Sequence, residues 1–228
     1  ERNQKVAVAL AKLLQRAGVN FSILGEEERC TGDPARRIGN EYLFQMLAGQ
    51  NITTLNTYGI KKIVTSCPHC FNTIRNEYPK LGGTYEVVHH TELLADLTQQ
   101  GRLHPQRPMH GVATFHDPCY LGRHNGVYDS PRRLLGAIPG LQVKEMDRCR
   151  ERGFCCGAGG GLMWFEEKIG KRVSWERTEE ALALQPQVLA SACPFCLIMF
   201  EDALKVKDAI GMTRPLDVAE LMAQSVDI

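Results

Sequence analysis

Cysteine is the residue type that dominates the chemistry of this 228-residue sequence. The nine cysteines are clustered rather than scattered, at positions 30, 67, 70, 119, 149, 155, 156, 193 and 196. A disulfide scaffold is usually short, poor in regular structure and even in its cysteine count. The length, odd count and clustering therefore favour thiolates that hold a metal ion or an iron–sulfur cluster in a reducing compartment.

Five of the cysteines lie in the second half with spacings that suit one shared site. They are Cys119, the adjacent pair Cys155 and Cys156, and the pair Cys193 and Cys196 of a Cys-x-x-Cys motif. A cubane cluster or a structural zinc takes four thiolates, so five is one too many for either. Adjacent Cα atoms are about 3.8 Å apart, so both neighbours can reach one cluster, especially if one sulfur bridges two irons. The glycine-rich run 157–161 lets the backbone approach a bulky inorganic core, and its spacing differs from that of a dinucleotide-binding motif.

The sequence repeats itself with an offset of 126 residues. Cys30, Cys67 and Cys70 superpose on Cys156, Cys193 and Cys196 without a gap. Residues 101–110 contain Gly101, Pro105 and Pro108, which interrupt regular structure. We therefore predict a tandem duplication, with a first domain over residues 1–105 and a second over residues 106–228.

The first copy has fewer cysteines than the second. Arg29 stands where the second copy has Cys155, and the equivalent of Cys119 would precede residue 1. We therefore expect the chain to be a piece of a longer polypeptide. Cys30, Cys67 and Cys70, with an upstream cysteine, would make four ligands for a cubane [4Fe–4S] cluster or a zinc ion.

The elements that must position these residues alternate between helices and strands, which predicts an α/β fold with a mostly parallel sheet in each half. Both Cys-x-x-Cys motifs directly follow a strand and open a helix, at the edge of a parallel sheet where ligands collect. The expected strands are 21–24, 62–65, 85–88, 111–115, 141–145 and 187–191, and the expected helices are 4–17, 35–49, 68–77, 91–100, 130–137, 162–184, 194–205 and 217–225.

Three segments resemble the cysteine-rich (CCG) domain of heterodisulfide-reductase-like iron–sulfur proteins. They are His116-Asp117-Pro118-Cys119, Phe154-Cys155-Cys156-Gly157 and Ala192-Cys193-Pro194-Phe195-Cys196. The resemblance covers essentially the whole chain as two copies, and residues 29–37 are similar to the branch that links electron-transfer flavoprotein to quinone. It implies that Cys119, Cys155, Cys156, Cys193 and Cys196 bind a noncubane [4Fe–4S] cluster.

The resemblance also implies a function. The chain would be the electron-transfer module of a larger oxidoreductase between a flavoprotein donor and a quinone-reactive membrane portion, placed in the cytoplasm at the inner face of the cell membrane. A heterodisulfide or thiol reductase module and a non-catalytic zinc-stapled domain are the alternatives, although zinc does not explain why Cys155 adjoins Cys156.

Composition and single residues complete these expectations. The net charge of +1 argues against a nucleic-acid partner. The sequence contains no run of 18 apolar residues, so we expect no transmembrane segment within these 228 residues. Cys149 lies outside the repeat register and is expected to be an ordinary free thiol. His116, near the end of a strand, is a candidate proton relay beside the cluster or a structural hydrogen-bonding residue.

Overall fold

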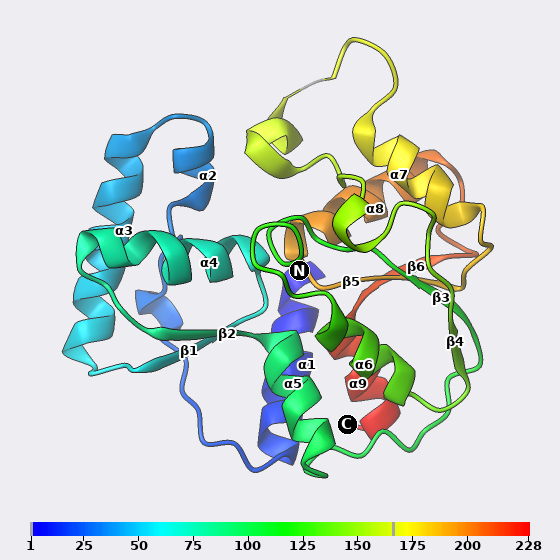
Figure 1. The fold of residues 1–228 in the computed structure, drawn as a ribbon, viewed down its shortest axis with the longest axis horizontal. Coiled ribbons are helices and arrows are strands. Elements are labelled where there is room, and N and C mark those ends of the chain that lie inside the picture. The colour runs from blue at the N-terminus through cyan, green and yellow to red at the C-terminus, as the bar shows by residue number, and fades with distance from the viewer. Residues whose placement is uncertain (1, 166) are drawn as a thin grey trace.

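The computed structural model describes residues 2–165 and 167–228 of the chain. Within these residues the strands form two parallel sheets (Figure 1). The first half contributes a two-stranded sheet of β1 (Lys62–Thr65) and β2 (Glu86–His89). The second half contributes a four-stranded sheet in the order β4, β3, β5, β6. Its strands are β3 (Gly111–Phe115), β4 (Leu141–Val143), β5 (Val188–Ser191) and β6 (Arg214–Asp217).

The helices follow the predicted alternation. Those of the first half are α1 (Arg2–Arg16), α2 (Asp33–Arg37), α3 (Glu41–Thr57), α4 (Pro68–Asn72) and α5 (His90–Gln99). Those of the second half are α6 (Asp129–Ala137), α7 (Val173–Leu182), α8 (Pro194–Val206) and α9 (Val218–Val226). The expected helix over 35–49 is divided into α2 and α3 because Gly39 takes a φ of 88°, which ends the first of the two. Among the described residues, no helix combines the length and the apolar character that a membrane-spanning helix requires.

The duplication predicted from the cysteine offset is confirmed. β1 and α4 are related to β5 and α8 by 126 residues, and β2 and α5 are related to β6 and α9 by 128 residues at their starts. Even the helix caps correspond: α5 and α9 begin with capping boxes formed by His89 with Glu92 and by Asp217 with Glu220. Equivalent sequences therefore fold into equivalent strand–helix units.

The two halves are packed crosswise, meaning that helices of each half pack against helices of the other around one shared apolar cluster. α1 of the first half lies against α9 of the second, and α6 of the second lies against α5 of the first. A single apolar cluster includes Leu13, Leu94, Leu134 and Leu221, one residue from each of these four helices. Residues 101–110 connect the halves without helix or strand, and the N–H groups of residues 106 and 107 donate to Ser225 O.

Two element predictions are wrong, and one strand was missed. Residues 21–24 form no strand, since Phe21 and Ile23 are exposed and no neighbouring strand pairs with them in the described chain. In place of a helix over 162–184, a short 3₁₀ turn (Gly159–Trp164) and α7 are separated by an irregular segment, of which position 166 lies outside the described residues. β6 was not among the expected strands; it contains Pro215, which is tolerated there because β6 is an edge strand.

Candidate metal centre

Both Cys-x-x-Cys motifs occupy the carboxyl end of a parallel strand, as the sequence predicted. Cys67 follows β1 and is the N-cap of α4, and Cys193 follows β5 and is the N-cap of α8. A proline comes next in each case, and its fixed φ suits the first helical position. The second cysteine lies in the first turn of the helix, so the two sulfurs of a motif are held on one side. In α8, which is 13 residues long, the positive end of the helix dipole favours thiolates there.

The five cysteines of the second half come together at this edge. Cys196 Sγ donates to Cys156 Sγ across 3.2 Å. Cys155 is hydrogen-bonded to Cys119 and to Cys156, and Cys193 is hydrogen-bonded to Cys196. Cys156, Cys193 and Cys196 are buried, and Cys119 and Cys155 are half-buried. The structure thus links the sulfurs of Cys119, Cys155, Cys156, Cys193 and Cys196 in one continuous cluster.

The electrostatics of this sulfur cluster call for a cation. Hydrogen bonds from Cys119 and Cys156 lower the pKa of Cys155 to about 2. Donating to Cys155, together with burial, raises the pKa of Cys119 and of Cys156 above the ordinary thiol value. Burial raises the pKa of Cys193, but its contacts with Cys196 and His69 outweigh it and lower the pKa to about 5. When only protein atoms are present, thiolates are therefore favoured at Cys155 and Cys193, and the thiols beside them keep their protons because like charges repel at this distance. A soft, positively charged inorganic core fits a site with this donor set.

The glycine after the cysteine pair shapes the site. Gly157 has a φ of 90°, and a Cβ there would approach Ser174 N to 3.1 Å and Val173 Cβ to 3.3 Å. Its N–H donates to Cys155 Sγ at 3.2 Å. A side chain at position 157 would both strain the backbone and crowd α7. The Cys-Cys-Gly sequence therefore lets the backbone itself contact a sulfur of the site.

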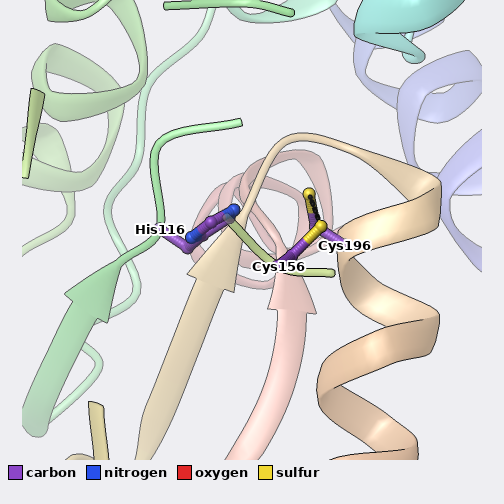
Figure 2. Close-up of side chains that lie close together, drawn as sticks. All are labelled: His116, Cys156 and Cys196. Carbon is purple, nitrogen blue, oxygen red and sulfur yellow. Dashed lines mark hydrogen bonds between the residues drawn. The ribbon is translucent and has the colours of Figure 1, made fainter. Parts of the chain in front are cut away.

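His116, which directly follows β3, faces the same sulfurs. One ring nitrogen lies within 4.8 Å of the sulfurs of Cys156 and Cys196, and all three residues are buried. Figure 2 shows the outer nitrogen of the His116 ring directed toward the two cysteines. The inner nitrogen, Nδ1, accepts from Arg177 Nε at 3.1 Å. Burial, followed by the charge of Arg177, lowers the pKa of His116 well below its ordinary value.

The loop between His116 and Cys119 is fixed by Asp117. This buried carboxylate accepts two hydrogen bonds from Arg132, at 2.7 and 2.9 Å, and one from Arg150 N at 2.7 Å. A bidentate arginine pair is geometrically specific. The His116-Asp117-Pro118-Cys119 segment thus carries one residue that faces the site, one that holds the loop and one sulfur.

The first half brings Cys67 and Cys70 together and leaves Cys30 exposed. Cys67 and Cys70 are hydrogen-bonded, and Thr31 Oγ1 donates to Cys70 Sγ at 3.5 Å. Cys30 Sγ accepts the N–H of Gly32, also at 3.5 Å. Arg29, which replaces the fifth cysteine, donates to Glu26 O. The first site is therefore a sulfur pair with a third cysteine on the adjoining loop.

His69, inside the first Cys-x-x-Cys motif, reaches the second site. Its Nδ1 donates to the buried Asp33 at 2.8 Å, and its ring packs against Tyr120 and Phe195, with centroids 4.4 and 4.8 Å away. It is also hydrogen-bonded to Cys193. Burial lowers the pKa of His69, but the bonds to Asp33 and Cys193 outweigh it and raise the pKa to about 10. The two cysteine groups are thus neighbours across the boundary between the halves.

Sequence reasoning did not identify Arg177 or the Asp33–His69 pair as parts of the site. Arg177 contacts a residue 61 positions away, and Asp33 contacts one 36 positions away. One sequence signal could have identified Arg177: it is a charged residue on the face of α7 that the helical pattern places in the core. Cys149 takes no part in the hydrogen bonds described above among the five sulfurs, and it is half-buried.

The fold and the site together define a duplicated α/β module that gathers cysteine sulfurs at the carboxyl ends of parallel strands. The family model described as "Cysteine-rich domain", or CCG, matches residues 1–75 and 113–201. The chain therefore belongs to the CCG cysteine-rich family. The two matched ranges fall in the two copies of the duplication.

The named relatives are oxidoreductases and a subunit of a reductase. The chain is 56% identical over 225 residues to a "Probable iron-sulfur-binding oxidoreductase FadF" of Bacillus subtilis and 49% identical over 234 residues to "EtfAB:quinone oxidoreductase" of Syntrophomonas wolfei. It is 39% identical over 232 residues to a subunit of the dihydromethanophenazine:CoB–CoM heterodisulfide reductase of Methanosarcina mazei. The alignments cover 98–100% of this chain, but 32%, 33% and 56% of the three relatives.

Proposed function

We propose that this chain is an iron–sulfur electron-transfer module of a larger oxidoreductase that passes electrons between a flavoprotein and a quinone. The observation that carries the proposal is the meeting of five cysteine sulfurs, from three separate segments, at one partly buried site. Relatives named as iron–sulfur and quinone oxidoreductases support the same function.

In this proposal Cys119, Cys155, Cys156, Cys193 and Cys196 hold a noncubane [4Fe–4S] cluster. When bound, the cluster would supply one-electron transfer. The protein supplies the thiolates, excludes water from Cys156, Cys193 and Cys196, and presents the N–H of Gly157 to a ligand sulfur. Hydrogen bonds of this kind set the reduction potential.

Cys30, Cys67 and Cys70 form the second proposed site. With an upstream cysteine they would bind a cubane [4Fe–4S] cluster or a zinc ion. The hydrogen bond between Cys67 and Cys70 and the nearby Thr31 hydroxyl support a shared site. The exposure of Cys30 leaves room for a ligand from outside the described residues.

The partners and the location follow from the same proposal. The flavoprotein would donate electrons, and a quinone-reactive membrane portion would accept them, which places the chain at the cytoplasmic face of the cell membrane. The relative named "Probable membrane-anchored ferredoxin", of Chromohalobacter salexigens, is 40% identical over 232 residues and supports this placement. Residues 1–105 and 106–228 would be its two cysteine-rich units.

A thiol or heterodisulfide reductase module is the second candidate function. The 39% identity to a heterodisulfide reductase subunit over 98% of the chain favours it. In that function the two neighbouring cysteine groups would face a disulfide substrate. Reduction of a disulfide by the reconstituted protein, without any quinone, would distinguish this candidate from the first.

The decisive experiment is anaerobic purification and reconstitution of the natural full-length protein, with iron and sulfide counts and electron paramagnetic resonance (EPR) spectra. Replacing Cys155 or Cys156 by serine is expected to remove about four iron atoms per chain or to change the EPR signal of the second site. Comparing the iron count of each variant with that of the parent removes the contribution of iron that is bound elsewhere in the protein. A colourless, zinc-containing parent protein would instead support the zinc-stapled alternative.

Cys149→Ser is the matched control. Cys149 lies six residues before Cys155 and takes no part in the sulfur hydrogen bonds of the site. Its replacement should leave the iron content and the EPR signal unchanged. Loss of the signal in Cys149→Ser, with retention in Cys155→Ser, would contradict the proposed ligands.

A further inference from the structure

The orientation of His116 leaves one of its two ring nitrogens for the sulfur site. Nδ1 is occupied by Arg177, and the ring edge packs against Phe200 with centroids 4.8 Å apart. Nε2 is buried and has no hydrogen-bond partner among the protein atoms of residues 2–165 and 167–228. An unpartnered buried donor or acceptor is costly, so this nitrogen needs a partner at the site that it faces.

The chemistry of arginine decides which nitrogen carries the proton. A guanidinium has five N–H donors, no acceptor, and does not lose its proton in proteins. Because Arg177 Nε donates to His116 Nδ1, that nitrogen must accept and cannot carry a proton. The neutral imidazole then holds its proton on Nε2, which is the nitrogen directed toward Cys156 and Cys196 (Figure 2).

Arg177 is itself held firmly in place. It is fully buried on α7, and its Nη1 donates to Glu180 Oε2 at 2.8 Å and to Arg148 O at 2.9 Å. Glu180 in turn accepts from the backbone N–H and the side chain of Arg148. These partners fix the plane of the guanidinium, so Nε stays aimed at His116.

We infer that Arg177 is a positioning residue that fixes the tautomer of His116, so that His116 offers an Nε2–H hydrogen bond to the sulfur atoms of the Cys156–Cys196 site. A protonated Nε2 cannot ligate a metal, so His116 is a donor rather than a sixth ligand. It also cannot take up a second proton while Arg177 occupies Nδ1, so this role replaces that of a proton relay. This inference deepens the proposed function. It rests on the proposed function only in assuming that a cluster is bound at the sulfur site, whereas the tautomer of His116 follows from protein atoms alone.

A hydrogen bond to a cluster sulfur stabilises the more negative, reduced state, so it makes the reduction potential more positive. Removal of the donor is therefore expected to shift the potential of the second site to a more negative value. His116→Leu removes the donor, whereas His116→Gln keeps an N–H of similar reach. The glutamine variant should retain part of the potential that the leucine variant loses.

The first measurement is the tautomer itself, read by ¹⁵N NMR of histidine-labelled, metal-free full-length protein at neutral pH. His116 is expected to show the pattern of Nε2–H with a bare Nδ1. Arg177→Met should abolish this pattern, and Arg148→Met should leave it intact, because the Arg148 side chain shares Glu180 but does not contact His116. A proton on Nδ1 in the parent protein would overturn the inference, whether or not any variant folds.

The second measurement is an EPR-monitored redox titration of the reconstituted protein. The expected order of potentials is parent, His116→Gln, then His116→Leu as the most negative. Equal shifts in the two variants, or a potential of His116→Leu equal to that of the parent, would show that His116 is not a hydrogen-bond donor to the site. If no iron binds to the parent protein, the proposed function fails, while the NMR result still decides the tautomer.

Discussion

At the scale of single residues, the sulfur site depends on charges that are buried behind it. Arg177 is a fully buried guanidinium whose carboxylate partner is Glu180, three residues further along α7. Burial raises the pKa of Glu180, but the hydrogen bonds from Arg148 and Arg177 outweigh it and lower the pKa below its ordinary value. Glu180 therefore links the stability of the fold to the orientation of His116.

Glu180→Gln is expected to lower the free energy of unfolding at pH 7 by about 2 kcal/mol, because a charged hydrogen-bond acceptor is lost beside a buried cation. Since the folded-state pKa of Glu180 is lowered, its contribution is complete above the unfolded pKa of about 4.3 and disappears as the pH falls through the folded pKa. Urea titrations from pH 7 to pH 3 should show the parent and variant converging in acid.

Glu179→Gln is the control for this comparison. Glu179 is the preceding residue on α7, but it is more exposed and pairs with Lys171 and Lys207 at the surface. Exposed ion pairs contribute little to stability because water and salt screen them. A loss in Glu179→Gln as large as that in Glu180→Gln would contradict the role given to the buried arginine.

At the scale of elements, the strand–helix units after each Cys-x-x-Cys motif meet at the boundary between the halves. Asp217 caps α9 by accepting from Ala219 N, and its Oδ1 also accepts from His90 Nε2 at 2.9 Å. Both residues are fully buried. The cap of a helix in the second half is therefore also the polar contact to a helix in the first.

Asp217→Ala should cost about 3 kcal/mol of unfolding free energy. About 1 kcal/mol comes from the lost N-cap, and the rest from leaving His90 Nε2 buried without a partner. Asn40→Ala removes an exposed N-cap from α3 and should cost only about 1 kcal/mol. Equal losses in the two variants, measured by urea unfolding, would show that the contact with His90 contributes nothing.

The strand–helix units that carry the cysteines were the predictable part of the fold. The 126-residue offset located β1, β5 and both Cys-x-x-Cys helices, because strand, cysteine, proline and helix are local signals. Residues 21–24 were wrongly predicted as a strand because Phe21, Ile23 and Leu24 give the segment β propensity whether or not a neighbouring strand exists. The irregular segment before α7 was wrongly predicted as helix because the spacing of apolar residues over 162–184 does not report backbone conformation. Gly160, Gly161 and Gly170 all take positive φ, which an α-helix does not allow.

That the five cysteines of the second half lie at one site was also predictable, since their spacing and the strand–helix pattern place them at one sheet edge. The residues that surround these sulfurs could not be predicted from the sequence. Arg177 touches His116, and His69 touches Asp33, only because the fold brings together residues 61 and 36 positions apart. Distances of this kind depend on the crossing of helices and on core volume, which no local pattern records.

At the scale of the whole molecule, the two halves share their core. α1 and α6 each cover a helix of the other copy, so each half leaves apolar surface uncovered when it stands alone. Although the sequence is repeated, we therefore do not expect either half to fold independently of the other.

Residues 1–105 produced alone should lack the cooperative unfolding transition of the parent, because α1 then has no α9 to cover Leu13 and Leu14. Circular dichroism and thermal unfolding of the two fragments, 1–105 and 106–228, are the measurements. Mixing the fragments should restore a single transition. Two fragments that each unfold cooperatively without the other would contradict the shared core.

The crosswise packing has a consequence for synthesis of the chain. α1 leaves the ribosome well before α9, the helix that covers it, which is completed about 200 residues later. At about 5–20 residues per second this is a delay of roughly 10–40 s. During that time Cys30, Cys67 and Cys70 have already been translated, while Cys193 and Cys196 do not yet exist for most of it. The nascent first half therefore presents thiols and an uncovered amphipathic helix to the cell, and the five-cysteine site cannot assemble until translation has passed α8.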